Sequence, residues 1–188
     1  MEDKKFILIY GIKNERLDIL RRVADKYEFG LRPIEDHEVD LKVSRILEGK
    51  SEKPEDFVFD DSLGDDFEYM LFVNIHDELL YNFLEEIKKE GVYIPHKAVL
   101  TETNRNWPLR YLMNENKEEH KVMSLYGQLR KAMNVGVGLL EKTQDQELEE
   151  ILERAQDYFH PREFEFEELR DIYNTLAQRI NDLLAKER

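Results

Sequence analysis

The feature that most constrains the fold is an alternation of strands and helices that occurs twice within the first 121 residues. Phe6–Tyr10 and Tyr69–Val73 are continuous apolar runs, which is typical of strands buried on both faces of a sheet. Each run is followed by an amphipathic helix with apolar residues three and four apart, then by a second short strand and a second helix. This order predicts an α/β fold.

The two copies of the pattern indicate a weak internal repeat, in which Phe6–Ile12 aligns with Tyr69–Ile75. Neither copy alone could bury its strands, so we expect them to combine into one four-stranded, mostly parallel sheet with helices packed on it. The alternative is a ferredoxin-like antiparallel sheet. We favour the parallel arrangement because three of the four strands are apolar on both faces. The repeated units are residues 5–49 and 68–121.

The domain organisation follows from where this pattern stops. Residues 50–66 are mostly acidic and polar, and we interpret them as a linker between the two copies. Residues 1–121 are then the α/β domain, and residues 122–188, which contain no strand pattern, are a helical extension. Gly136 and Gly138 are expected to loosen or end the first helix of this extension.

The extension is expected to contain a helical hairpin, because two later stretches carry apolar residues at helical spacing around a break at His160-Pro161. One interpretation is two antiparallel helices packed on each other. The other is a dimerising arm, in which the apolar face of the last helix forms an interface between two copies of the chain. The candidate interface residues are Leu169, Tyr173, Leu176, Ile180 and Leu183.

Composition excludes several classes of protein. Hydrophobic residues make up 41 % of the chain, enough for a core, but the longest apolar run, Phe6–Ile12, is far shorter than the roughly 20 residues of a membrane-spanning helix. The formal net charge of −14 disfavours general nucleic-acid binding. The absence of cysteine excludes disulfides and thiolate ligands. The N-terminal residues do not form a signal peptide, so a cytoplasmic location is expected.

The charge is unevenly distributed along the chain. Residues 96–142 carry 8 basic and 5 acidic side chains, whereas the segments on either side are net acidic. The negative charge of the other segments repels anions, so an anion, an acidic partner or a nucleic acid would dock on residues 96–142. Basic residues placed near helix ends by chance are the alternative explanation.

The most distinctive motif lies in this segment, where an apolar strand is followed by Thr-x-Thr-Asn and then by tryptophan. The motif resembles the signature of a bacterial family, domain of unknown function 3783, over roughly residues 67–121. The resemblance implies a small α/β module and no particular activity. The residues that match the signature are Lys97, Ala98, Leu100, Thr101, Thr103, Asn104 and Trp107, with Leu109 and Leu112 in the helix that follows.

Two interpretations of this loop stay open. It follows the carboxyl end of a strand and leads into a helix, which is where open α/β sheets bind ligands, so its donors and its indole could hold a small anion. Alternatively, the threonines and an asparagine satisfy a turn and a helix cap, while the tryptophan fills the core. The candidate ligand-binding residues are Lys97, Thr101, Thr103, Asn104, Arg105 and Trp107.

No motif nominates catalytic residues, a metal site or a cofactor. The five histidines show no His-x-x-x-His pair, and Gly136-Val-Gly138 lacks the third glycine and the preceding strand of a dinucleotide-binding motif. The leading hypothesis is therefore a non-enzymatic regulatory or scaffolding module that forms a homo-oligomer or binds a protein partner. The alternative is a sensor or enzyme that uses the Lys97–Trp107 loop to bind a small anion.

Overall fold

The computed structural model describes residues 4–50, 63–64, 66–160 and 164–186. The chain divides into two compact units, residues 1–118 and 119–188, so the division falls near the end of the second repeat. Most of the proposed linker over residues 50–66 lies outside the described residues. Each unit has its own apolar core.

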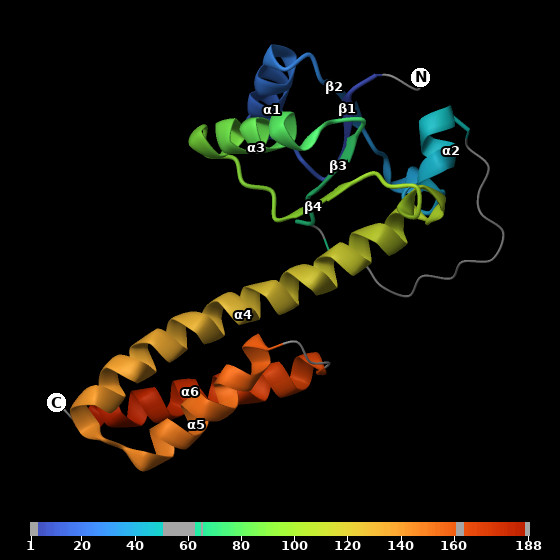
Figure 1. The fold of residues 1–188 in the computed structure, drawn as a ribbon. Coiled ribbons are helices and arrows are strands. Elements are labelled where there is room, and N and C mark those ends of the chain that lie inside the picture. Colours follow the sequence, from blue (N-terminus) through green and yellow to red (C-terminus); the bar gives the residue numbers. More distant parts are fainter. Residues whose placement is uncertain (1–3, 51–62, 65, 161–163, 187–188) are drawn as a thin grey trace. The chain divides into compact units, whose positions relative to one another are not determined.

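The first unit contains one four-stranded sheet with the strand order β2-β1-β3-β4 (Figure 1). β1 is parallel to β2 and β3 is parallel to β4, whereas the two central strands, β1 and β3, are antiparallel. The prediction of an α/β fold with a four-stranded, mostly parallel sheet is confirmed. The strands are β1 (Phe6–Tyr10), β2 (Gly30–Pro33), β3 (Tyr69–Val73) and β4 (His96–Val99).

Helices cover both faces of this sheet (Figure 1). α1 and α3 pack on one face, where they bury apolar side chains against Ile7 and Phe72. α2 and the start of α4 pack on the other face, against Leu8 and Leu71. Short 3₁₀ turns, η1 and η2, precede α2 and α4. The bounds are α1 (Asn14–Lys26), η1 (Asp36–Glu38), α2 (Val43–Glu48), α3 (Asp77–Lys89), η2 (Asn104–Asn106) and α4 (Leu109–Thr143).

The two halves of the first unit are related by an approximate two-fold axis. At the centre of the sheet Leu8 pairs with Leu71, which is also its counterpart in the repeat alignment. The same alignment places the first and last residues of α1 on those of α3. A second antiparallel bridge joins Lys42 to Pro108, at the starts of α2 and α4. A two-fold relation reverses strand direction between the halves, which explains why the central pair is antiparallel although each half is parallel.

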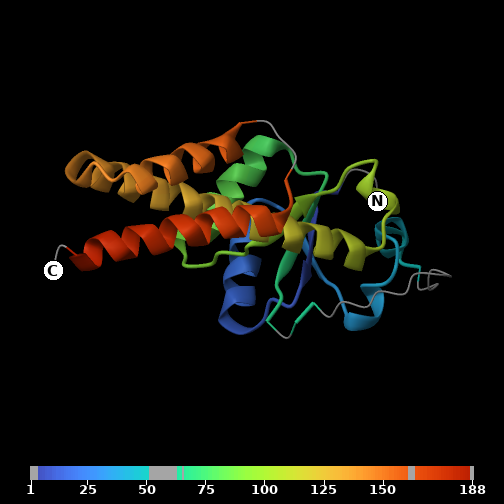
Figure 2. The same cartoon turned by 90° about the horizontal axis from the view of Figure 1, so that it is seen from below.

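The second unit is built from the later part of α4 with two further helices, which lie side by side in Figures 1 and 2. α5 spans Gln146–Gln156 and is followed by the 3₁₀ turn η3 (Asp157–Phe159), and α6 spans Phe166–Lys186. The predicted hairpin is thus packed against a third helix. Apolar side chains from all three helices form the core.

The expectation that Gly136 and Gly138 loosen or end a helix is wrong, because α4 continues through both to Thr143. Gly136 has a packing role within the helix. A Cβ atom at this position would lie 3.0 Å from Cδ2 of Leu152, so the missing side chain lets α5 approach α4 closely. A Cβ at Gly138 would meet nothing within 4 Å.

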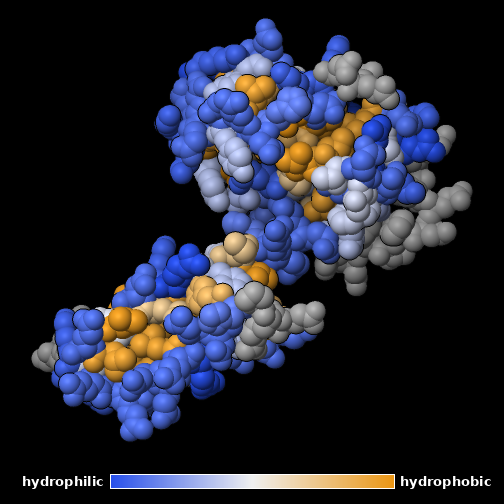
Figure 3. Space-filling model, viewed as in Figure 1, coloured by the Kyte–Doolittle hydropathy of each residue, from blue (hydrophilic) through white to orange (hydrophobic). Residues whose placement is uncertain are grey.

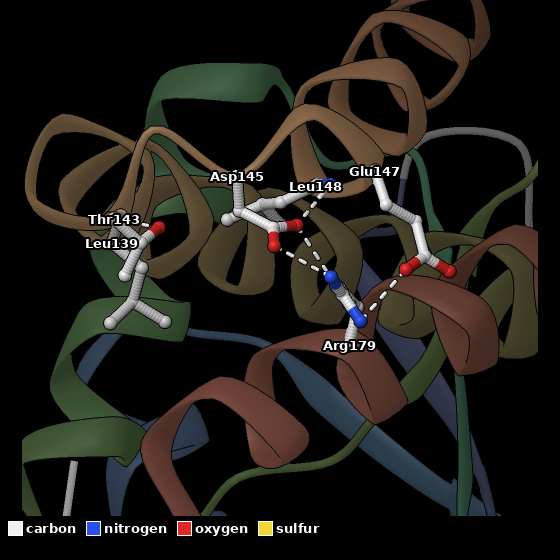
Figure 4. Close-up of polar contacts among 6 residues, drawn as sticks. All are labelled: Leu139, Thr143, Asp145, Glu147, Leu148 and Arg179. Atoms are coloured by element: carbon white, nitrogen blue, oxygen red, sulfur yellow. Dashed lines mark hydrogen bonds and ion pairs between the residues drawn. The ribbon is translucent and has the colours of Figure 1, made fainter. Parts of the chain in front are cut away.

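A cluster of ion pairs links α6 to the turn that connects α4 with α5 (Figure 4). Asp145 caps α5 by accepting a hydrogen bond from the backbone N–H of Leu148 at 2.8 Å. The guanidinium of Arg179 donates to the same carboxylate from Nε at 3.0 Å and from Nη2 at 2.6 Å, while its Nη1 lies 2.7 Å from Glu147. The hydrogen bonds from Arg179 are the main reason that the pKa of Asp145 lies below its ordinary value.

Candidate functional site

The Thr-x-Thr-Asn motif forms a closed turn in the structure. The backbone N–H of Asn104 donates to Oγ1 of Thr101 at 3.1 Å, and the backbone N–H of Thr101 donates to Oδ1 of Asn104 at 2.8 Å. Asn104 is only 8 % exposed. These two side chains therefore satisfy the backbone between β4 and η2, which is the structural interpretation of the motif.

Asn104 also protects the edge of the sheet. β4 is an edge strand, and because the N–H of Leu100 donates to Phe72 in β3, the carbonyls of Lys97 and Val99 point away from β3. Asn104 Nδ2 donates to the Val99 carbonyl at 2.9 Å, and Asn116 Nδ2 donates to the Lys97 carbonyl at 3.1 Å. Both outward carbonyls are thus occupied by side chains, which hinders pairing with another strand.

Lys97 and Trp107 also have structural contacts. Lys97 Nζ donates to the carbonyl of Ile94 at 3.0 Å and lies 5.2 Å from the ring centre of Tyr93, and its partial burial lowers its pKa. Trp107 packs its ring edge-on against Tyr111 at 5.1 Å and joins the core under α2 and α4. The contacts of both side chains therefore belong to the fold.

The other two predicted ligand residues differ from each other. Thr103 is exposed, and its side chain makes no capping hydrogen bond to η2. Arg105 is half-buried and lines a cavity of about 550 Å³. The structure therefore does not bring the six predicted residues together around one pocket. Arg105 instead lines a cavity that belongs to a different candidate site.

That site is a groove at one edge of the first unit, which we call the β1–α2 groove. It consists of the cavity beside Arg105 and a larger one of about 750 Å³, and the two share Phe6 and Leu47 in their walls. Figure 3 shows apolar surface open to solvent on this unit, bordered by hydrophilic side chains. The apolar wall of the groove consists of Phe6, Leu31, Ile46, Leu47, Val73 and Leu100.

The rim of the groove is positive. Among the residues that the structure describes, five cationic side chains and two acidic ones, Glu28 and Glu48, line the groove, a net charge of +3 in a chain whose formal charge is −14. Lys50 lies 2.9 Å from Glu48, and the pKa of that carboxyl is lowered by its hydrogen bond to Lys50 and, to a smaller extent, by the charge of Arg105. The cationic residues are Lys4, Lys5, Arg32, Lys50 and Arg105.

Two of these cations already have partners in the fold, Lys50 through Glu48 and Arg32 through two groups. Arg32 Nη2 lies 2.6 Å from Glu38, and its Nη1 donates to the carbonyl of Ile46 near the end of α2. Arg32 thus braces α2 against β2 and shapes the wall of the groove. Lys4, Lys5 and Arg105 are the side chains best placed to meet an incoming anion.

The topology explains why the smaller cavity of the groove, beside Arg105, lies here. The carboxyl ends of β3 and β4, marked by Val73 and Leu100, meet at this edge. From this edge the chain continues to α3 on one face of the sheet and to α4 on the other. Diverging connections of this kind open a crevice, which is the usual ligand position in open α/β sheets. The antiparallel centre of the sheet also brings the start of β1 here.

The residues predicted as a dimer interface lie inside the second unit. Leu169, Leu176, Ile180 and Leu183 are buried, and Tyr173 is partly buried against the same cluster. They pack on apolar side chains of α4 and α5, so this face is covered by the chain itself.

The described part of the chain shows neither a metal cluster nor a membrane span. Among those residues, no group of three or more His, Asp or Glu side chains is arranged to hold a metal ion. No helix there is both long enough and apolar enough to cross a bilayer.

Residues 68–123 match the family model DUF3783, a domain of unknown function. The resemblance is therefore confirmed for this segment. The DUF3783 segment covers β3, α3, β4, η2 and the start of α4, which is the second half of the two-fold arrangement. Neither the curated proteins nor the solved structures yielded a match.

Proposed function

We propose that this protein is a non-enzymatic, regulatory binding module that recognises a small anionic ligand in the β1–α2 groove. The observation that carries the proposal is the combination of an apolar wall with a rim whose described residues have a net charge of +3, in a chain of formal charge −14. Such a site attracts an anion through the rim and retains its apolar part by burial.

The size of the groove supports this ligand class. Ligand pockets for small molecules occupy roughly 300–1,000 Å³, and the two parts of the groove measure about 750 and 550 Å³. The DUF3783 segment contributes Val73, Leu100 and Arg105, and the first half of the unit contributes most of the remaining lining. Both halves of the unit are therefore needed to form the site.

Isothermal titration calorimetry would test the proposal with hexanoate, phenyl phosphate and neutral hexanol. We expect the two anions to bind and hexanol not to bind, because the cationic rim selects for charge. The double variant Lys5→Ala/Arg105→Ala should weaken anion binding at least ten-fold. A matched control is Lys88→Ala/Lys89→Ala, which removes two cations from α3, away from the groove. Equal affinity in both double variants would refute the proposal.

Self-association is the second candidate function, favoured by three apolar side chains that α4 exposes. Met123 is 62 % exposed, Val135 50 % and Val137 49 %, and covering such apolar surface with a second copy of the chain would remove it from water. Light scattering over a wide concentration range would test this candidate. A concentration-dependent mass that Val135→Glu abolishes would support it, and a constant monomer mass would contradict it.

A further inference from the structure

The approximate two-fold relation supplies an internal comparison for the β1–α2 groove. Phe6 pairs with Gly30 in the first half as Tyr69 pairs with His96 in the second, so Gly30 and His96 are counterparts. Lys4 and Phe67 are counterparts as well, because each stands two positions before the first residue of its central strand.

In the second half, the space at Phe67 and His96 is filled by aromatic rings. The ring of Phe67 stacks on His96 with 4.7 Å between ring centres and an angle of 20°, and it stacks on Tyr69 at 6.3 Å and 15°. Phe67 is 6 % exposed and belongs to the core that α4 covers. The chain itself therefore supplies a buried aromatic side chain at this place.

In the first half, the described residues leave the same position unfilled. Gly30 has no side chain where His96 has an imidazole, and Lys4 is exposed where Phe67 is buried. Both Gly30 and Lys4 line the 750 Å³ cavity of the groove, with Phe6 in place of Tyr69. The fold can thus fill this space with aromatic side chains, and in the first half no side chain of the described residues fills it, beside a cationic rim.

We propose that the β1–α2 groove binds a small aromatic acid, whose ring occupies the place that Phe67 takes in the other half. The ring would lie against Phe6 and the apolar side of α2, where Ile46 faces the cavity. The acidic group would meet the cationic rim, where Lys5 lines the same cavity as the ring and Arg105 lines the adjoining one. This inference rests on the proposed function and adds to it that the apolar part of the ligand is aromatic.

Titration of matched phosphate esters tests the aromatic part of the inference. Phenyl phosphate and cyclohexyl phosphate carry the same acid on rings of similar size, and inorganic phosphate carries no ring. We expect phenyl phosphate to bind about 3- to 10-fold more tightly than cyclohexyl phosphate, because only the planar ring can stack on an aromatic side chain. Inorganic phosphate should bind more weakly than both.

A pair of variants at one position tests where the ring lies. Lys4→Phe places an aromatic side chain where Phe67 stands in the other half, and Lys4→Ala removes the same charge without filling the space. We expect Lys4→Phe to reduce phenyl phosphate binding at least ten-fold more than Lys4→Ala. Fluorescence of Trp107, which is the single tryptophan of the chain, would confirm that both variants are folded.

The possible outcomes separate the two proposals. Equal affinities for the phenyl and cyclohexyl esters, both lost in Lys5→Ala/Arg105→Ala, would overturn the aromatic inference and leave the anion site intact. Equal binding by Lys4→Phe and Lys4→Ala would overturn the assigned ring position. Absence of binding by every anion would overturn both proposals, as would binding that the groove variants do not change.

Discussion

Replacement of Asn104 by alanine tests whether the most distinctive motif in the sequence serves the fold. The Asn104 side chain accepts a hydrogen bond from the backbone of Thr101 and donates one to the carbonyl of Val99, at 2.8 and 2.9 Å. It is almost fully buried. Alanine removes both bonds and leaves a backbone donor and a backbone acceptor without their partners.

The expected loss follows from these contacts. A capping or turn hydrogen bond to the backbone contributes about 1 kcal/mol, and the second bond contributes about the same, so Asn104→Ala should lower the free energy of unfolding by about 2 kcal/mol. Thr103→Ala is the matched control in the same motif, since Thr103 is exposed. A substitution at an exposed position of this kind changes the free energy of unfolding by less than about 0.5 kcal/mol.

Urea denaturation followed by the fluorescence of Trp107 is a direct assay, because the single tryptophan lies close to Asn104 in the sequence and packs in the first unit. With a denaturant slope of about 2 kcal/mol per M, the midpoint should fall by about 1 M in Asn104→Ala and by less than about 0.25 M in Thr103→Ala. Similar midpoints for the two variants would refute a structural role for the motif.

Three further predictions concern backbone conformation and charge. Gly138→Ala should raise the stability of the second unit by up to about 1 kcal/mol in thermal unfolding, whereas Gly136→Ala should gain less because its Cβ would lie 3.0 Å from a leucine of α5. Gly11→Ala should prevent the first unit from folding, as judged by circular dichroism, because Gly11 has φ +72° and a Cβ there would overlap a backbone carbonyl oxygen just before β3. Arg179 lowers the pKa of Asp145, so the stabilisation from this carboxylate is present above its unfolded pKa and is lost as the pH falls through its lowered folded pKa. Between about pH 5 and pH 2, the free energy of unfolding should therefore fall more steeply with decreasing pH in the wild-type chain than in Asp145→Asn. Parallel curves of this free energy against pH would contradict the prediction.

Much of the fold could be predicted because hydrophobic periodicity is a local signal. The apolar runs at Phe6–Tyr10 and Tyr69–Val73 indicate buried strands, and the structure shows that these two strands pair with each other at the centre of the sheet. The strand order was not predicted. The antiparallel direction of that central pair was not predicted. It depends on how the two halves dock, and a run that is buried on both faces looks the same in either direction.

The later helices show where local signals mislead. Gly136 and Gly138 favour the end of a helix, since glycine lowers helix propensity by about 1 kcal/mol. Packing overrides this cost, because α4 contributes buried side chains on both sides of the glycines, such as Leu129 and Leu139. The apolar face from Leu169 to Leu183 is assigned correctly to a helix, but the sequence could not show that α4 would help to cover it.

The candidate site was predictable only at one residue. Arg105 could be identified because it follows the carboxyl end of β4, where ligands collect in α/β folds. Lys4, Lys5 and Lys50 were missed because they belong to the other half of the unit. Only the strand order brings the start of β1 beside the end of β3, and no short motif encodes that order.

The position of a bound anion tests the central claim most directly. Titration of ¹⁵N-labelled protein with phenyl phosphate, followed by amide chemical shifts, would locate the ligand without any substitution. The β1–α2 groove predicts that the largest shifts cluster at Lys5, Gly30, Arg32 and Gly49, which line its larger cavity. Shifts that cluster instead around the Thr101–Asn104 turn or in the second unit, or the absence of any saturable shift, would contradict the claim.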